Sequence, residues 1–416
     1  MSEATLDDIA LPEIDVSRPE LYRDDTWGPL FERLRREDPV HYCESSANGK
    51  FWSVTTHELI KAVDTNHEVF SSGAGGISIV DPPEEEQDID QGIENFIAMD
   101  PPEHDEQRRT VAPSVAPSNL ANLEPLIRER AADILDHLPV GETFNWVDKV
   151  SIELTARMLA TLFDFPYEER RKLVYWSDIT TAIPQTTGDE GVDLEHRHAE
   201  LMKCAEAFYA LWHERAAQEP KADLISMLAH GESTKNMHEN PKLFLGNILL
   251  LIVGGNDTTR NSISGGVVGL NQYPEEYEKL RVNQGLIPNM VAEMVRWQTP
   301  VLHMRRTALR DYELGGKQIR EGDKVIMWYI SGNRDETVFD DPNRLIIDRK
   351  NARSHVAFGF GIHRCMGNRL AEMQLRALWE EIMKRFHHIE VVGEVKRNAN
   401  NFIRGIAEVP VRLHPR

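Results

Sequence analysis

One short stretch constrains this chain more than any other: FGFGIHRCMG at residues 358–367, followed at once by the helix-forming run NRLAEMQLRALWEEIMKRF. Gly359 and Gly361 allow a tight, bulged loop in which backbone amides can point at the sulfur of Cys365. The run that follows places Cys365 at or just before a helix N-terminus, where partial positive charge lowers the pKa of a thiol. The stretch therefore predicts a thiolate held by amides, with Phe358 shielding the sulfur from water.

Three roles are open to such a cysteine. Most lone cysteines are small buried thiols that only fill space. A catalytic nucleophile would need a histidine base, and His363, two residues away on a tight loop, is poorly placed to serve as one. An axial ligand to haem iron suits a thiolate in a dry pocket. Cys43 and Cys204 lie far from Cys365 in the chain and form no CxxC pair, so a zinc cage, an iron–sulfur cluster or a disulfide framework is not expected.

Composition excludes several classes of protein. The 416 residues are 41% hydrophobic and 28% charged, which is ordinary for a globular protein with a large core. The net charge of −21 argues against nucleic-acid binding and against docking on an anionic membrane. The start MSEATLDDIA has no secretory pattern, and the longest apolar run, ILLLIV, is too short to span a bilayer. We expect a soluble, cytoplasmic protein with no transmembrane segment.

Hydrophobic periodicity predicts a mainly α protein with a small β-rich lobe (α+β). Helical patterns run from about 119 to 297 and from 366 to 385, and extended patterns occur near 35–60 and 301–333. The segment 81–106 holds eleven acidic residues, four prolines and no Lys or Arg, so we expect a long irregular loop there.

A second unusual feature is the insert GGNDTT at 254–259, inside the apolar helical run 242–270. Glycine costs about 1 kcal/mol in a helix interior, so the insert is a poor choice for a plain helix. It is consistent with a kinked core helix or with a functional groove. Helical spacing places Leu250, Leu251, Gly254 and Thr258 on one face.

These stretches resemble the cytochrome P-450 family. Its haem-ligand loop, Phe-x-x-Gly-x-x-x-Cys-x-Gly, is matched at Phe358, Gly361, Cys365 and Gly367, and the resemblance extends from about residue 20 to the end. It implies one triangular helical domain over 1–416 with a β-rich lobe, although length alone suggests two or three domains. It also implies haem b (iron protoporphyrin IX), held by the thiolate of Cys365.

The resemblance implies roles for further residues. Thr258 would hydrogen-bond dioxygen at the iron, and Asp257 would relay protons from solvent. Glu293 and Arg296 match the family's buried Glu-x-x-Arg pair, with Arg344 as the third member. The residues expected to bind the haem propionates are His104, Arg108, Arg306 (or its neighbour Arg305) and His355. Phe358 and Gly367 of the loop are expected to contact the cofactor as well.

A monooxygenase of this kind needs two electrons from outside. The resemblance implies a 2Fe-2S ferredoxin and a flavin-dependent ferredoxin reductase as partners. Residues 349–385 hold eight Lys or Arg against three Glu, a basic patch suited to an acidic ferredoxin. These cations are Arg349, Lys350, Arg353, Arg364, Arg369, Arg376, Lys384 and Arg385.

The expected substrate is small and hydrophobic. The stretches MDPPEHDEQRR, TPVLHMRRTALRDYELGG and MWYISGNRDE resemble bacterial alkane hydroxylases, which oxidise the terminal methyl of medium-chain alkanes and often of fatty acids. A terpene or steroid hydroxylase is the main alternative, and a peroxide-driven enzyme or a non-catalytic haem sensor are two others. By family position, the pocket residues are Ile97, Leu250, Leu251, Gly254, Val301, Leu302, Phe402 and Ile403.

Overall fold

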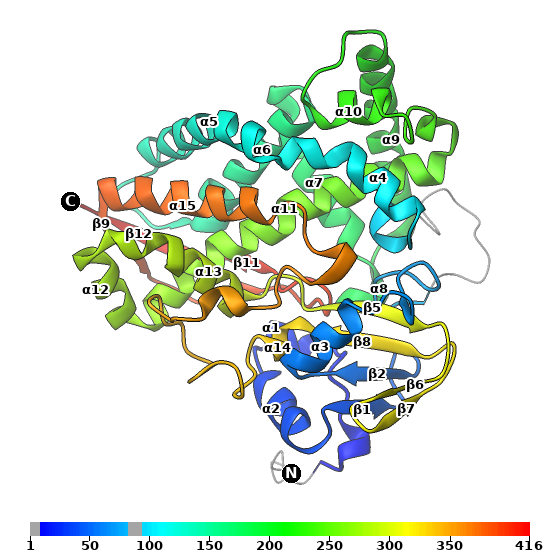
Figure 1. The fold of residues 1–416 in the computed structure, drawn as a ribbon. Coiled ribbons are helices and arrows are strands. Elements are labelled where there is room, and N and C mark those ends of the chain that lie inside the picture. Colours follow the sequence, from blue (N-terminus) through cyan, green and yellow to red (C-terminus); the bar gives the residue numbers. More distant parts are fainter. Residues whose placement is uncertain (1–8, 82–93) are drawn as a thin grey trace.

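The computed structural model describes residues 9–81 and 94–416. Its longest helix, α11 (Pro241–Gln272), runs through the middle of the molecule and contacts α6, α7, α13 and α15 (Figure 1). The side chain of Asn240 caps its first turn by accepting hydrogen bonds from two backbone amides, and Pro241 occupies the first helical position. The polar insert at 254–259 does not interrupt the helix.

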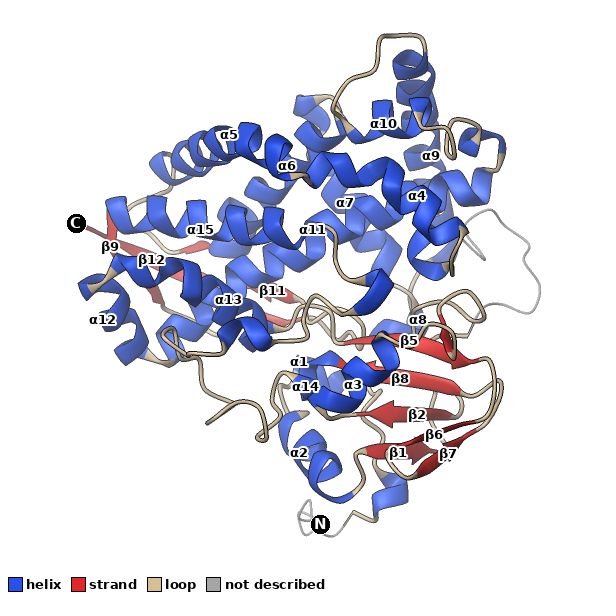
Figure 2. Cartoon of the chain, in the orientation of Figure 1, coloured by secondary structure: helices blue, strands red, loops and turns tan. Residues whose placement is uncertain are grey.

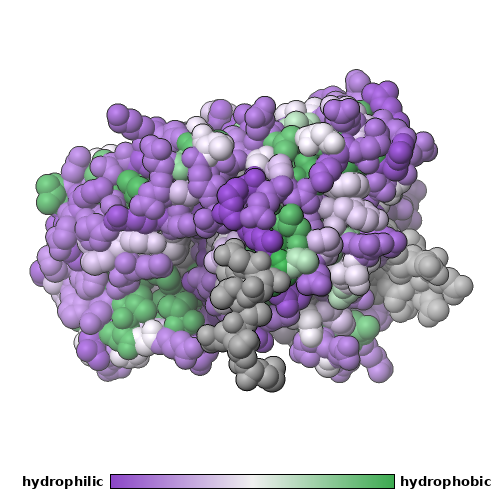
Figure 3. All heavy atoms as spheres, turned by 90° about the horizontal axis from the view of Figure 1, so that it is seen from below, coloured by the Kyte–Doolittle hydropathy of each residue, from purple (hydrophilic) through white to green (hydrophobic). Residues whose placement is uncertain are grey.

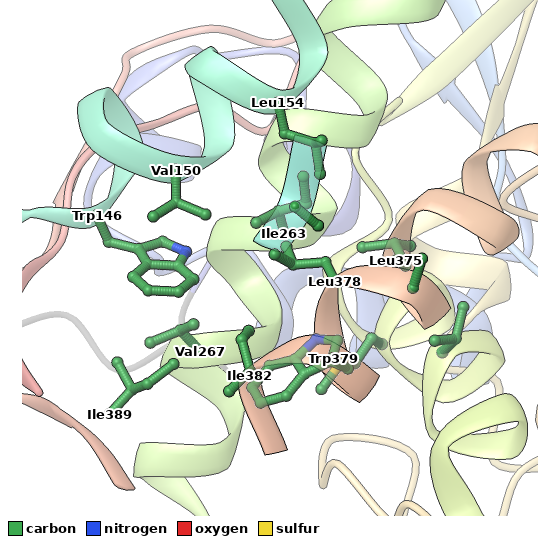
Figure 4. Packing of buried hydrophobic residues seen from close by; sticks show 14 of the residues in the cluster. Trp146, Val150, Leu154, Ile263, Val267, Leu375, Leu378, Trp379, Ile382 and Ile389 are labelled. Atoms are coloured by element: carbon green, nitrogen blue, oxygen red, sulfur yellow. The ribbon is translucent and has the colours of Figure 1, made fainter. Parts of the chain in front are cut away.

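Helices form most of the molecule. They are α1 (Glu20–Arg23), α2 (Gly28–Glu37), α3 (His57–Asp64), α4 (Glu103–Val111), α5 (Pro117–Asp136), α6 (Ile152–Phe163), α7 (Arg171–Thr181), α8 (Pro184–Thr187), α9 (Leu194–Ala216), α10 (Leu224–His230), α11, α12 (Pro274–Val282), α13 (Ile287–Gln298), α14 (Tyr329–Gly332) and α15 (Asn368–Arg385). The largest core cluster lies where α6, α11, α15 and β9 meet (Figure 4). Trp146, Ile263 and Trp379 fill its centre, each at most 1% exposed.

In the described residues, the strands form a five-stranded sheet at one side of the helices and three smaller sheets (Figure 2). The five-stranded sheet has the order β1 (Val40–Cys43), β2 (Phe51–Val54), β8 (Lys324–Trp328), β5 (His303–Ala308), β3 (Phe70–Ser71). Its β2–β8 pair is parallel and the others are antiparallel. Strands near residue 50 thus pair directly with strands near residue 325, inside the two stretches where extended structure was expected.

The remaining strands are shorter hairpins and a C-terminal sheet. They are β4 (Phe144–Asn145), β6 (Tyr312–Leu314), β7 (Lys317–Ile319), β9 (Phe386–Val391), β10 (Lys396–Arg397), β11 (Ile406–Glu408) and β12 (Pro410–Pro415). The C-terminal strands were not predicted from the sequence. The acidic segment is also less irregular than expected, because a 3₁₀ turn spans Phe96–Ala98 and α4 begins at Glu103. Residues 82–93 of that segment lie outside the described residues.

The surface seen from below is mostly hydrophilic, with small scattered apolar groups beside residues drawn in grey (Figure 3). Within 9–81 and 94–416, no helix is both long and apolar enough to cross a membrane.

Candidate active site

The loop before α15 positions Cys365. The Cys365 amide donates to the carbonyl of Phe358 at 2.8 Å, which closes the loop. Gly359 and Gly361 have φ values of +64° and +66°, in the left-handed region that favours glycine. A Cβ on Gly361 would also collide with the backbone of Asp64, so the loop can pack against α3 only with glycine there.

The Cys365 side chain is exposed on the wall of an internal cavity. Backbone amides of Gly367 and Asn368 donate to the sulfur, as a helix N-terminus predicts. Burial nevertheless raises the pKa of the thiol, and the amides, Arg108 and Arg364 only partly offset it. The expectation of a lowered pKa is therefore wrong for the protein alone. A bound metal ion would deprotonate the thiol outright.

Helix α11 forms the opposite wall of the cavity. Gly254 and Thr258 both line it, and a Cβ placed on Gly254 would meet no atom within 4 Å. The hydroxyl of Thr258 donates back to the Gly254 carbonyl at 2.9 Å. The helix is therefore continuous at Gly254 and Thr258, and the missing side chain of Gly254 leaves space on the cavity side.

Asp257 points away from the cavity. Its carboxylate is fully buried and accepts hydrogen bonds from Ser177 of α7 at 3.2 Å and from Asn256 at 3.0 Å. Arg260 lies 2.8 Å from it and also pairs with Asp178, whose side chain is about half exposed. Burial raises the pKa of Asp257 to about 6, against the opposing charge of Arg260. Asp257 is thus a proton-holding group, linked through Arg260 to an acid at the surface.

The cavity has a volume of about 430 Å³, and seven of the eight expected pocket residues line it. These are Ile97, Leu250, Leu251, Gly254, Val301, Phe402 and Ile403. Leu302 does not. Successive side chains of an extended segment point to opposite faces, so with Val301 in the cavity, Leu302 packs into the core with Trp328 and Ile330.

The same alternation resolves the choice between two neighbouring arginines on β5. Arg306 lines the cavity, and its Nη2 donates to Asp64 at 2.8 Å. Arg305 turns to the other face and pairs with Asp81 at 2.8 Å. Arg108 of α4 also lines the cavity and donates to the carbonyl of Arg364, the residue before Cys365. Two cations therefore lie beside the cysteine loop.

Two histidines complete this charged end. The rings of His104 and His363 lie 4.3 Å apart, and both side chains are buried. His104 donates from Nδ1 to Asp105, but its Nε2 and both ring nitrogens of His363 have no partner among the described residues. Of the three histidines, only His363 lines the cavity; His355, like His104, does not. His355 packs against Phe358, and its Nδ1 accepts the amide of Ala357, so His363 replaces it as the candidate.

These features fit a haem. Three buried ring nitrogens without partners and two cavity-lining arginines can serve two propionates, since buried polar groups require partners. Phe358 and Gly367 line the wall around the Cys365 sulfur, which is the single soft ligand that a haem iron needs.

A buried ion cluster holds the chain segment 333–349, which precedes the cysteine loop. Glu293 and Arg296 of α13 are joined by two hydrogen bonds of 2.7 Å, and both side chains are 0% exposed. The third member is Arg349, 3.0 Å from Glu293 and 4% exposed. The expected third member, Arg344, is wrong: its side chain is 43% exposed and pairs with Glu275. Only its backbone carbonyl reaches Arg296.

Sequence reasoning missed three residues that shape the site. His363 belongs to the quoted loop but was weighed only as a base, and Arg349 was counted as a surface cation. Asp64 was not considered, although its carboxylate binds Arg306, Tyr329 and the amide of Phe360. No local pattern marks Asp64, because its partners lie more than 240 residues away.

Comparison with known proteins agrees with this geometry. The Cytochrome P450 family model matches residues 140–411. Linalool 8-monooxygenase of Pseudomonas putida is 36% identical and covers 97% of this chain and 99% of its own.

Two solved structures are similar in both sequence and fold. CYP153D17 from Sphingomonas sp. PAMC 26605 is 47% identical with a TM-score of 0.90, over 96% of this chain and 98% of its own. Cytochrome P450-153 from Novosphingobium aromaticivorans is 46% identical with a TM-score of 0.89, over 96% and 99%. They confirm the predicted mainly α fold with a small β-rich lobe.

Proposed function

Because the chain belongs to the cytochrome P450 family, whose monooxygenases bind haem through a cysteine thiolate, we propose that it hydroxylates the terminal methyl of a medium-chain alkane or fatty acid. The observation that carries the proposal is the character of the cavity. Its charged groups gather beside Cys365, and its other walls are mainly apolar, with a few uncharged polar residues. An apolar pocket with few polar groups suits a hydrocarbon chain.

We call the part of the cavity wall formed by α7 and α8 the far end. Its polar residues favour a substrate without polar groups. Thr180, Thr181 and Thr186 line this end, and each hydroxyl donates to a backbone carbonyl of its own segment. These hydroxyls therefore bond within the protein, and the methyl groups of the threonines remain available to contact a substrate. Both arginines of the described lining are tied to the cysteine loop instead. A neutral alkane therefore fits this end better than a carboxylate would.

When bound, the haem supplies the activation of O₂ and the insertion of one oxygen atom into a C–H bond. The chain's own residues manage protons and position. Thr258 lines the cavity, and Asp257, whose pKa is raised to about 6, can take up and release a proton at near-neutral pH. Since Asp257 faces α7, proton transfer to Thr258 requires its carboxyl group to leave Arg260 and Ser177.

We propose a ferredoxin, reduced by a flavin-dependent reductase, as the electron donor. The docking surface is smaller than the sequence suggests, because Arg349 is buried and Arg353, Arg376, Lys384 and Arg385 form ion pairs. Of the eight cations in residues 349–385, three are exposed and make no ion pair with a described residue: Lys350, Arg364 and Arg369. They lie near Cys365 in the chain and would attract an acidic partner. The unpaired, buried Cys43 and Cys204 fit a reducing cytoplasm.

A terpene hydroxylase is the second candidate, favoured by the similarity to linalool 8-monooxygenase. A titration of the haem protein with octane, octanoic acid and a rigid terpene, followed in the Soret band, separates the two. A spin-state shift with octane, and 1-octanol on turnover with a surrogate ferredoxin system, supports the proposal. A shift with the rigid terpene alone moves the substrate to the second candidate.

A further inference from the structure

The part of the cavity wall that contains Thr181 and Thr186, which we call the end wall, also contains residues 400–403, the tip of the C-terminal hairpin, which we call the C-terminal tip. Phe402 and Ile403 of the tip line the cavity. The tip lies between β10 and β11 and belongs to no long strand. Its position is therefore decided by a few specific hydrogen bonds.

Asn400 shapes the tip from within. Its Oδ1 accepts the backbone amides of both Phe402 and Ile403 at 2.8 Å. This is the side-chain-to-backbone turn that Asn and Asp form locally. Asn400 is 7% exposed, so losing its oxygen would leave buried amides without a partner. Asn400 Oδ1 therefore helps to orient the two cavity-lining side chains, together with the backbone pairing of Phe402 and Ile403 with Leu302 and Val301.

Asn401 ties the tip to two other segments. Its backbone amide donates to the carbonyl of Thr186 in α8 at 2.9 Å. Its side-chain Nδ2 donates to Ser17 near the N-terminus at 2.8 Å and, more weakly, to Gln185 at 3.3 Å. The side chain is 0% exposed. The C-terminal tip is therefore held against α8, which contains the cavity-lining Thr186.

His303 ties the tip to a third segment. Its Nδ1 donates to the Asn401 carbonyl at 2.9 Å, and its Nε2 accepts the amide of Ile79 at 3.1 Å. Burial lowers the pKa of His303 to about 3, so the ring is neutral and keeps one donor and one acceptor. The ring also packs on Phe402, with centroids 5.3 Å apart.

We propose that Asn400, Asn401 and His303 are positioning residues that fix the end wall of the cavity and thereby select which carbon of a linear substrate reaches the iron. The inference rests on the proposed function. Oxidation of a terminal methyl requires the chain end to be held still, and a displacement of about 1 Å can cost roughly 100-fold in rate. A rigid end wall provides that control.

The test compares Asn400→Ala with Asn400→Asp. Asp keeps the oxygen that accepts both amides, whereas Ala removes it. In Asn400→Ala we expect the ratio of terminal to subterminal alcohol from C6–C12 alkanes to fall by roughly threefold to tenfold. Amide hydrogen exchange at Phe402 and Ile403 should accelerate in the same variant. Asn400→Asp should keep both the product ratio and the slow exchange.

Faster exchange in Asn400→Ala with an unchanged product ratio would overturn the inference. If the wild type oxidises no alkane, the proposed function fails, and hydrogen exchange still reports whether Asn400 holds the tip. A second pair guards against misfolding: His303→Asn keeps a donor near the Nδ1 position and should retain selectivity, whereas His303→Leu should lose it. Equal selectivity in these two variants would remove His303 from the proposal.

Discussion

The two ends of the cavity are built in opposite ways. At the cysteine end, polar groups face inward: Arg108 and Arg306 line the wall, and His104 and His363 hold buried nitrogens without partners among the described residues. At the far end, hydroxyls and amides bond to the protein itself, and mainly carbon faces the cavity. Polar groups without partners suit the charged cofactor, whereas polar groups that bond within the protein suit the apolar substrate that we propose.

The largest difference between the two ends is expected in the haem spectrum when one side chain at each end is replaced by alanine. Cys365→Ala should abolish the thiolate character of the haem spectrum completely, because no other cysteine lines the described part of the cavity. Phe402→Ala should leave that spectrum intact and change only substrate binding. The absorption of the reduced carbon monoxide complex distinguishes the two outcomes. A normal thiolate spectrum in Cys365→Ala would refute the ligand assignment.

The cysteine end should also depend more on buried charge for its stability. Arg349→Met removes one partner of fully buried Glu293 and should cost roughly 3–5 kcal/mol of unfolding free energy. Arg344→Met, at an exposed ion pair, should cost less than about 1 kcal/mol. Denaturant unfolding of both variants measures the difference. Equal losses would mean that Arg349 is not the third member of the cluster.

Between the two ends, Asp257 should make stability depend on pH. Its pKa rises from 3.8 to about 6, so the folded protein binds the proton more tightly than the unfolded chain does. The resulting stabilisation is complete below about pH 4 and is lost as pH rises through about 6.

Asp257→Asn cannot ionise. Its stability relative to the wild type should therefore improve by up to about 3 kcal/mol between pH 4 and pH 7. Urea unfolding at a series of pH values measures this change, with Asp178→Asn, at the exposed end of the same ion network, as the control. A pH-independent difference would contradict the raised pKa.

Haem affinity should distinguish the two histidines that compete for the propionate role. His363→Phe removes nitrogens that face the cavity, and a charge-assisted hydrogen bond contributes about 1.5–3 kcal/mol, so haem should dissociate at least roughly tenfold faster. His355→Phe, at a side chain behind Phe358, should change the rate little. Transfer of haem to an acceptor protein gives both rates. The reverse order would return the role to His355.

The smallest effect is expected at the outer surface of the cysteine end. Arg364→Gln with Arg369→Gln should slow reduction by ferredoxin several-fold at low salt, and the difference should shrink as salt screens the charges. The matched control is Arg376→Gln with Arg385→Gln, which neutralises two cations already paired with Glu124 and Asp136. Stopped-flow reduction rates compare the pairs. An equal loss of reduction rate in both pairs would mean that ferredoxin binding depends on the net charge of the protein rather than on this surface.

Much of the site could be predicted where bonding is local. The Cys365 loop is closed by bonds between residues a few positions apart, and Thr258 shares a helix face with Gly254 through helical spacing alone. The direction of Asp257 could not be predicted. Which side of a buried helix carries a charge depends on the neighbour that packs there, and that neighbour is α7.

The sequence by itself determined the thiolate loop, the helix that faces it and the Glu293–Arg296 pair, because each is specified by the spacing of residues within one turn. Only the tertiary structure decided the partners from distant segments. Arg349 rather than Arg344 completes the ion cluster, and His363 rather than His355 faces the cavity. Residue type is the same in each pair, so the path of the chain alone brings one member into the site and turns the other away.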